Sequence, residues 1–345
     1  MPPQWSPEGS PTSVPGFQVG HAQCPAGRSG ASVVLCPPAT VGGVAVRGSA
    51  AGSRQMDGLN PEHMVNEVHA LVFTGGSSFG LDAGGGVQAY LAERGVGFKA
   101  GPYTVPVAPT AVIFDLPLNP EGQRPDAAVG RAACVAAGGG VMARGNVGAG
   151  AGATVGKLFG PAQAMKGGLG GASLSLGGLH LGAMAVVNAF GDVMAGDGRL
   201  VAGARREAQG LELIDTAAWF LEGHRRQAFL PPSNTTLGVV VTNARLDKLT
   251  ACKLAGLAHH GLVQSVRPVH TIFDGDLVVV LASGEVEADL TGLGLMAAEC
   301  LRRAVLDAVW SAEGLPGLPC ARQLPGARDP RPDPASPGPG GTPCP

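Results

Sequence analysis

Short runs of apolar and β-branched residues, most of them ended by glycine or proline, alternate along the chain with a few longer stretches of helical spacing. A run of about four to eight such residues between turn residues is typical of a buried strand. We expect strands at Gly16–Gly20, Ala31–Cys36, Thr40–Gly48, Val68–Gly76, Ala111–Asp115, Gly171–Leu176, His180–Asn188, Leu237–Thr242 and Leu277–Ala282. Helical spacing predicts helices at Leu81–Arg94, Ala127–Gly138, Leu246–His260 and Leu290–Val309.

The predicted strands come in runs with a few long helices between them, and not in regular alternation with helices. Such an order favours sheets packed on each other with helices outside, and therefore an α+β fold over a doubly wound parallel sheet. A chain of 345 residues with 45% hydrophobic residues can form one large domain or two. The 56 glycines follow no strict triplet, which excludes collagen and indicates tight turns and close backbone approach.

Three polar segments are expected to lie outside the packed core. Residues 1–15 are rich in proline and polar residues and predict a flexible lead. Residues 204–230 are polar and irregular, as in a surface linker. Residues 314–345 hold ten prolines and several glycines, which predicts a disordered tail.

Composition narrows the classes of partner. A net charge of −2 with 14% charged residues provides no basic surface for nucleic acid or an anionic membrane. Seven cysteines without a C-x-x-C pair fit a reducing compartment, so we expect a cytoplasmic protein. We expect no secretory signal, because residues 1–14 are polar and rich in proline and lack a basic end followed by an apolar run. We expect no membrane span, because no apolar run approaches about 18 residues. His259 and His260 point apart on a helix, and no metal or cofactor is expected.

The stretch from Pro231 to Thr242 places Ser-Asn-Thr-Thr between two prolines and a β-branched run that predicts a strand. A cut between Asn234 and Thr235 would free a threonine at the head of that strand. Its hydroxyl and its own α-amine would then form a self-contained catalyst. The same residues are also typical of a loop that enters a strand through an Asx turn, and the local sequence leaves both interpretations open.

Ser78 is a rival nucleophile, because Gly-Ser-Ser-Phe-Gly lies between a predicted strand and a helix and fits the G-x-S-x-G elbow. The chain before it lacks the strand–helix alternation of an α/β-hydrolase. His270 can be named as its triad partner but cannot be placed beside it. A tight turn of small residues also explains the motif.

Lys157 ends a Gly-Ala tract at residues 145–157 that fails as a phosphate loop, since two of its four fixed positions lack the required residue. A lysine crowded by small residues has a lowered pKa or supports an anion, although a solvated lysine at a helix end also fits. Asp274 and Asp276 flank a glycine. They could bind a metal, act as paired carboxylates or form a turn before a strand, and the turn is the default.

Several short motifs occur in one order between about residues 16 and 309. Together they resemble the L-aminopeptidase/D-esterase (β-peptidyl aminopeptidase) family, which includes the nylon-oligomer hydrolases. The motifs are Gly16–His21, Arg47-Gly48, Thr74–Ala83, Val112–Leu116, Gly145–Lys157, Val187–Asp192, Asn234–Leu237, His270-Thr271 and Asp274–Asp276.

This resemblance implies an N-terminal-nucleophile-type hydrolase with an α-β-β-α sandwich. The precursor would cut itself between Asn234 and Thr235 into a large subunit (16–234) and a small subunit (235–313) of the same sandwich. Thr235 would be the nucleophile, and Asn188 would help to hold the oxyanion.

The resemblance also assigns the surrounding groups and the substrates. Lys157 matches a lysine beside the nucleophile, and Asp274 and Asp276 match acidic residues that orient it. Phe114 stands where some members have a tyrosine, so a hydroxyl that would assist binding is missing. The implied substrates are small peptides, amino-acid amides or esters, or ω-amino-acid oligomers, with no cofactor and a tetramer of processed pairs. Ornithine acetyltransferases resemble this fold and also cut themselves before a threonine, so an acyltransferase stays an alternative.

Overall fold

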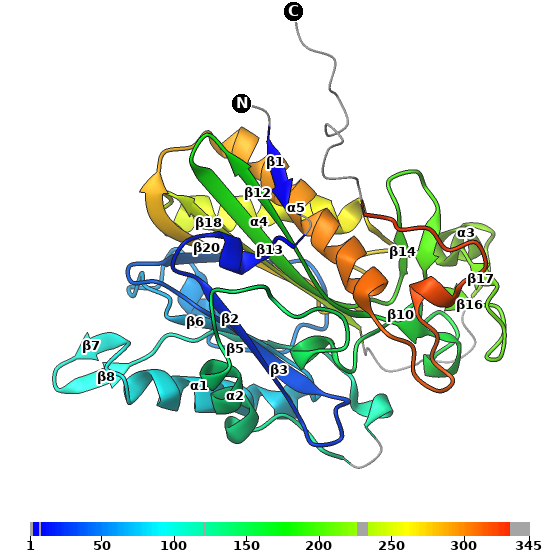
Figure 1. The fold of residues 1–345 in the computed structure, drawn as a ribbon, viewed down its shortest axis with the longest axis horizontal. Helices are drawn as coiled ribbons and strands as arrows, with labels where there is room; N and C mark the ends of the chain where they lie inside the picture. The colour runs from blue at the N-terminus through cyan, green and yellow to red at the C-terminus, as the bar shows by residue number, and fades with distance from the viewer. Residues whose placement is uncertain (1–2, 7, 120–121, 226–233, 332–345) are drawn as a thin grey trace, which may run out of the picture.

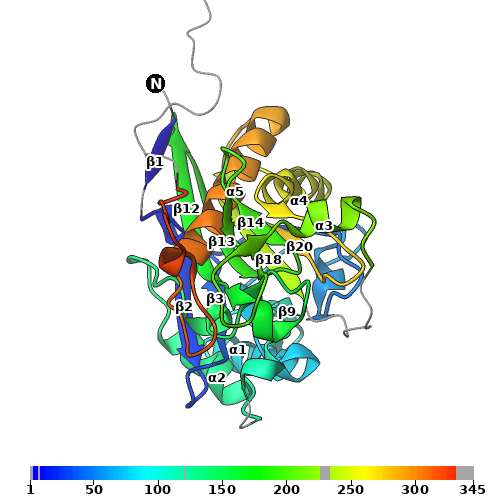
Figure 2. The same ribbon diagram turned by 90° about the vertical axis from the view of Figure 1, so that its right-hand side faces the viewer.

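Two β-sheets pack face to face, and each carries helices on its outer face, as Figure 1 and Figure 2 show. The computed structural model describes residues 3–6, 8–119, 122–225 and 234–331. The strand order of the six-stranded sheet is β1 (Gln4–Ser6), β12 (Gly168–Leu176), β13 (Leu179–Asn188), β18 (Thr235–Ala244), β20 (Leu277–Val286) and β4 (Val41–Val46). The order of the five-stranded sheet is β2 (Gln18–Gln23), β3 (Gly30–Leu35), β6 (Ala70–Thr74), β9 (Thr110–Val112) and β5 (Ser53–Arg54).

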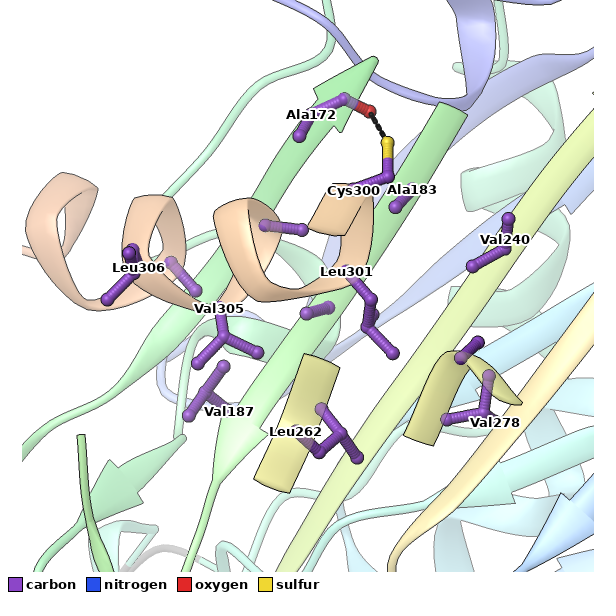
Figure 3. Packing of buried hydrophobic residues seen from close by; sticks show 14 of the residues in the cluster. Ala172, Ala183, Val187, Val240, Leu262, Val278, Cys300, Leu301, Val305 and Leu306 are labelled. Atoms are coloured by element: carbon purple, nitrogen blue, oxygen red, sulfur yellow. Dashed lines mark hydrogen bonds between the residues drawn. The ribbon is translucent and has the colours of Figure 1, made fainter. Parts of the chain in front are cut away.

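Apolar side chains fill three layers. Phe73, Val186 and Val239 belong to the layer between the two sheets. A second layer lies between the six-stranded sheet and helices α4 (Lys248–Val263) and α5 (Leu290–Ser311), where Val305 lies over Val187 (Figure 3). A third joins the five-stranded sheet to helices α1 (Asp82–Ala92) and α2 (Ala127–Val135). The predicted α-β-β-α sandwich is therefore confirmed.

Shorter elements extend the sandwich at its ends. They are β7 (Phe98–Ala100), β8 (Tyr103–Val105), β10 (Thr154–Val155), β11 (Met165–Lys166), β14 (Asp192–Met194), β15 (Leu200–Ala202), β16 (Ala204–Arg205), β17 (Leu213–Ile214), α3 (Thr216–Leu221) and β19 (Val266–Arg267). Every strand and helix that the sequence predicts overlaps an observed one. None of the helices within the described residues combines the length and the apolar character needed to cross a membrane.

The central strands bring distant parts of the chain to one edge. Strand β13 is antiparallel to β18, and β18 is parallel to β20. Consequently the end of β13 and the starts of β18 and β20 meet. At this edge Asn188, the last residue of β13, is the cross-strand partner of Thr235, the first residue of β18.

The two chain ends differ from the prediction. Strand β1 pairs with β12, and Pro11 and Val14 are buried, so the described part of residues 1–15 belongs to the fold. Residues 314–331 also pack against the sandwich, since the Pro319 carbonyl accepts a hydrogen bond from the Lys166 N–H and Arg331 pairs with buried Asp307. The predicted disorder is wrong for residues 314–331, and residues 332–345 lie outside the described ones.

The segment predicted as a surface linker is also part of the fold up to residue 225. Arg205 is 2% exposed, and its guanidinium donates hydrogen bonds to carbonyl oxygens of Ala162, Ala164, Ala208, Gly210 and Gly317. The prediction failed because an arginine counts as a surface residue in sequence, whereas here its charge is buried and several of its carbonyl partners are distant in sequence. Residues 226–230 lie outside the described ones.

Candidate active site

Thr235 begins the central strand β18 with its side chain almost fully buried, at 4% exposed. Its Oγ1 donates a hydrogen bond to the carbonyl oxygen of Asn234, with 2.5 Å between the two oxygens. The hydroxyl of Thr235 therefore lies directly beside the peptide bond that precedes it.

The loop that precedes β20 holds the Asn234–Thr235 peptide by hydrogen bonds. The Gly275 N–H donates to the Asn234 carbonyl oxygen at 2.9 Å, and Asn234 forms a parallel bridge with Asp274. The Asn234 side-chain amide donates to the Phe273 carbonyl at 3.2 Å. The Gly275 N–H and the Phe273 carbonyl are backbone groups of one loop, so Asn234 has a fixed position relative to that loop.

Asp276 joins strand β18 to His270. One carboxylate oxygen, Oδ1, accepts the Thr236 N–H at 2.6 Å. The other, Oδ2, accepts the His270 N–H at 3.1 Å and lies 2.9 Å from His270 Nδ1. Asp276 is 1% exposed, so these contacts replace its water.

Asp274 is buried to the same degree and accepts three hydrogen bonds. Its Oδ1 accepts the Phe190 N–H at 3.1 Å, and its Oδ2 accepts the Thr271 N–H at 3.1 Å and the Thr271 hydroxyl at 2.5 Å. Burial and the nearby Asp276 raise the pKa of Asp274 to about 6. Within the described ranges no group of three or more His, Cys, Asp or Glu side chains is arranged to hold a metal ion.

Lys157 contacts Asn188, the cross-strand partner of Thr235. Its Nζ donates to the Asn188 carbonyl at 2.9 Å and to Asn188 Oδ1 at 2.8 Å. Burial lowers the pKa of Lys157 to about 7, and the nearby Asp274 partly opposes this shift. Asn188 Oδ1 also accepts the Thr154 N–H at 3.0 Å, and Asn188 Nδ2 donates to the Phe114 carbonyl at 3.3 Å.

The structure thus brings the predicted site residues Thr235, Asn188, Lys157, Asp274 and Asp276 to one edge of the sandwich. Their chemical roles stay predictions. Ser78 lies elsewhere, exposed in a short 3-10 helix (Ser77–Leu81). His270 bonds Asp276 in the described part of the chain, which removes the partner suggested for Ser78.

Sequence reasoning missed three neighbours of the site. The sequence predicts Gly275 only as part of a turn, does not single out Thr154, and suggests His270 as a partner of Ser78, whereas His270 bonds Asp276. Two of them act through a backbone N–H, which has no sequence signature. Only the position of His270 close before Asp276 offered a signal.

A buried threonine at the head of a central strand, in an α-β-β-α sandwich, defines a hydrolase fold of the N-terminal-nucleophile (Ntn) class. The chain shares this fold with the L-aminopeptidase D-Ala-esterase/amidase of Ochrobactrum anthropi, described as a variant of the Ntn hydrolase fold. The TM-score is 0.67 over 91% of this chain and 90% of the other, at 18% identity. A β-aminopeptidase of Burkholderia sp. matches with a TM-score of 0.63 over 88% and 87%, at 20% identity.

The chain belongs to peptidase family S58, whose model matches residues 10–321. It is 39% identical to an uncharacterized aminopeptidase of Mycobacterium tuberculosis (strain H37Rv), over 92% of this chain and 98% of the relative. It is 31% identical to a 6-aminohexanoate-oligomer endohydrolase of Kocuria sp. (strain KY2), over 85% and 84%. The chain is therefore a hydrolase of amide bonds, and neither a serine hydrolase built on Ser78 nor an acyltransferase is favoured.

Proposed function

We propose that the chain cuts itself between Asn234 and Thr235, and that the freed Thr235 hydrolyses small amide substrates. The observation that supports this most directly is the contact of 2.5 Å between the Thr235 hydroxyl and the Asn234 carbonyl oxygen. A hydroxyl and the carbonyl it is to attack are then neighbours before any reaction, so proximity lowers the barrier.

In the first step Thr235 Oγ1 forms a bond to the Asn234 carbonyl carbon, and the carbonyl oxygen becomes an oxyanion. Lys157, whose pKa burial lowers to about 7, accepts the hydroxyl proton and passes it to the Thr235 nitrogen. The carbon–nitrogen bond then breaks and leaves an ester. Water hydrolyses this ester to an Asn234 carboxylate and a free Thr235.

Turnover repeats this chemistry on a substrate amide. The new α-amine of Thr235 has an ordinary pKa of roughly 7.7–8.0, so much of it is neutral near pH 7 and accepts the hydroxyl proton. The Asn188 side-chain amide stabilises the substrate oxyanion, an interaction worth about 3–4 kcal/mol in a well-studied enzyme. Water then hydrolyses the acyl-Thr235 ester. Asp274 and Asp276 hold the strand ends in register.

We propose the substrate class from the names of the relatives. Their names as aminopeptidases and as a 6-aminohexanoate-oligomer endohydrolase support short peptides with a free N-terminus, amino-acid amides or esters, or ω-amino-acid oligomers. We expect a homo-oligomer of processed pairs in the cytoplasm, without a cofactor. A panel of p-nitroanilides and 6-aminohexanoate oligomers would rank the substrates. Acyl transfer to glutamate without hydrolysis would contradict the proposal.

Intact mass spectrometry tests the self-cleavage. The purified wild-type protein should give two fragments, the smaller beginning with Thr235. Thr235→Ala should remain one chain without activity, while Ser78→Ala should be cut and active. An active preparation that holds only the full-length chain would contradict the proposal, and loss of activity in Ser78→Ala alone would favour the elbow serine.

A further inference from the structure

We infer that the backbone N–H of Gly275 is the oxyanion donor for self-cleavage, and that Asn188 is needed for substrate turnover but not for the cut. This inference rests on the proposed cleavage between Asn234 and Thr235. It separates two reactions that share one nucleophile, and it assigns each of them a different donor.

The position of the reacting oxygen is known for the cut, because the scissile carbonyl is part of the chain. The Gly275 N–H already donates to that oxygen at 2.9 Å. Effective oxyanion donors lie about 2.7–3.1 Å from the developing charge. The oxyanion would form on the Asn234 oxygen itself, so this donor already faces the atom on which the charge develops.

The Gly275 amide is held rigidly through both of its neighbours. The Asp274 carbonyl accepts the Ala50 N–H at 2.9 Å, and the Asp276 carbonyl accepts the N–H groups of Arg47 and Gly48 at 2.9 and 3.1 Å. The carboxylates of the same two aspartates accept further backbone N–H groups on the other side. A donor fixed before the reaction costs no reorganisation when charge develops, which is the basis of oxyanion stabilisation.

A glycine is required at this position by the nucleophile. A Cβ on residue 275 would lie 2.8 Å from Thr235 Oγ1 and 2.7 Å from the Ala50 carbonyl oxygen. Both distances are shorter than real Cβ contacts, and the second involves backbone. The absence of a side chain therefore lets the amide and the hydroxyl reach the same carbonyl together.

Asn188 is engaged differently in the intact chain. Its Oδ1 accepts hydrogen bonds from Lys157 and Thr154, and its Nδ2 donates to the Phe114 carbonyl. In the intact chain the Asn188 side chain is therefore bound to Lys157, Thr154 and Phe114, whereas the Asn234 carbonyl has the Gly275 N–H as a donor. Lys157 keeps a second acceptor, the Asn188 backbone carbonyl at 2.9 Å, even if the side chain is removed.

The test removes the Gly275 N–H without adding atoms. Cell-free translation with a suppressor tRNA that carries glycolic acid replaces the amide at Gly275 by an ester in the full-length chain. Cleavage is followed by intact mass, and we expect it to slow by about 10²–10³-fold, the usual effect of losing one oxyanion donor. The same ester at Gly101, exposed in the turn between β7 and β8, controls for the method and should cut like wild type.

Asn188→Ala gives the second arm. It should be cut within about fivefold of the wild-type rate, yet hydrolyse a p-nitroanilide about 10²–10³-fold more slowly. Thermal melting confirms that each chain is folded. Cleavage of the Gly275 ester at the wild-type rate, or an Asn188→Ala chain that stays uncut, would overturn this inference but not the proposed function. A wild-type chain that never cuts would instead overturn the proposed function together with it.

Discussion

Replacing Lys157 by methionine tests which group accepts the proton in the proposed self-cleavage. The free α-amine does not exist in the precursor, because the Thr235 nitrogen is still an amide. Lys157 lies on Asn188 with 7% of its surface exposed, and burial lowers its pKa from 10.5 to about 7. At pH 8 such a lysine is about 90% neutral, whereas one with a pKa of 10.5 is about 0.3% neutral, so burial supplies about 300-fold more base.

The cleavage rate should follow this titration. In the wild type it should rise about tenfold per pH unit below pH 7 and level off above, as expected for one base with that pKa. Lys157→Met should cut about 10²–10⁴-fold more slowly, without a rise through pH 7. Intact mass measures both profiles on newly translated chain, made by short cell-free synthesis and diluted at once into buffers from pH 5 to pH 9.

Stability provides an independent reading of the same substitution. The folded chain binds the Lys157 proton less tightly than the unfolded chain does, so the fold is penalised below pH 7 and relieved as pH rises from about 7 to 10.5. This penalty on the wild type is at most on the order of 5 kcal/mol. The methionine variant escapes it, but the variant also loses the hydrogen bonds to Asn188, which partly cancels its gain in stability. Lys157→Met should therefore melt at a higher temperature than wild type at pH 6, with a smaller difference at pH 10.

Lys166 provides the matched control. It is fully buried, and burial lowers its pKa to about 7 as well, but it donates to the carbonyl oxygens of Gly150, Ala153 and Gly167 at 3.0 Å each. The folded fraction of Lys166→Met should keep the wild-type pH profile of cleavage. A Lys157→Met chain that cuts at the wild-type rate, with the same rise through pH 7, would refute Lys157 as the base.

Three further predictions concern the fold. Arg205→Ala should lower the free energy of unfolding by about 3–5 kcal/mol in a urea titration, because five carbonyl oxygens, that of buried Ala164 among them, lose their donor and a buried side chain is removed; an unchanged midpoint would contradict this. A chain ending after Glu313 should melt well below one ending after Arg331, since residues 314–331 include Leu318, Cys320 and Ala321, which are buried against the sandwich. Equal melting temperatures would restore the disordered-tail prediction. Leu301→Ala should cost about 2–5 kcal/mol, as Leu301 is fully buried against β18, and a cost below 1 kcal/mol would indicate a collapsed cavity.

Strands and long helices could be predicted because each is specified by its own residues. In β18, Leu237, Val239 and Val241 face the layer between the sheets, while Val240 faces α4 and α5. A strand buried on both faces is apolar throughout, so its run of β-branched residues is visible without knowledge of its partners. The hairpin between β12 and β13 could also be predicted from its own residues, because its turn is a Gly-Gly pair. Gly177 and Gly178 both have the positive φ angles that such a turn requires.

The segments at residues 204–225 and 314–331 could not be predicted, because what orders them lies far away in sequence. Arg205 carries the charge that composition assigns to a surface, yet three of its five carbonyl partners, those of Ala162, Ala164 and Gly317, lie more than 40 residues away in sequence. Proline and glycine after residue 313 indicate loops, and a loop that packs its few apolar side chains against a helix has the composition of a disordered one. Local sequence reports the cost of burying such residues but not the groups that offset it.

The residues of the site also differ in whether the sequence alone could predict them. Thr235, Asn188, Lys157, Asp274 and Asp276 could be named from motifs, because their chemistry resides in side chains. The donor nearest to the Asn234 carbonyl is the amide of Gly275, and any residue except proline supplies an amide. What sets Gly275 apart is the space that its missing side chain leaves for the Thr235 hydroxyl, at a distance of 2.8 Å from where a Cβ would lie. That space exists only once β18 and β20 run in parallel with their starts aligned, so the glycine between two aspartates acquires its role from the register of the sheet.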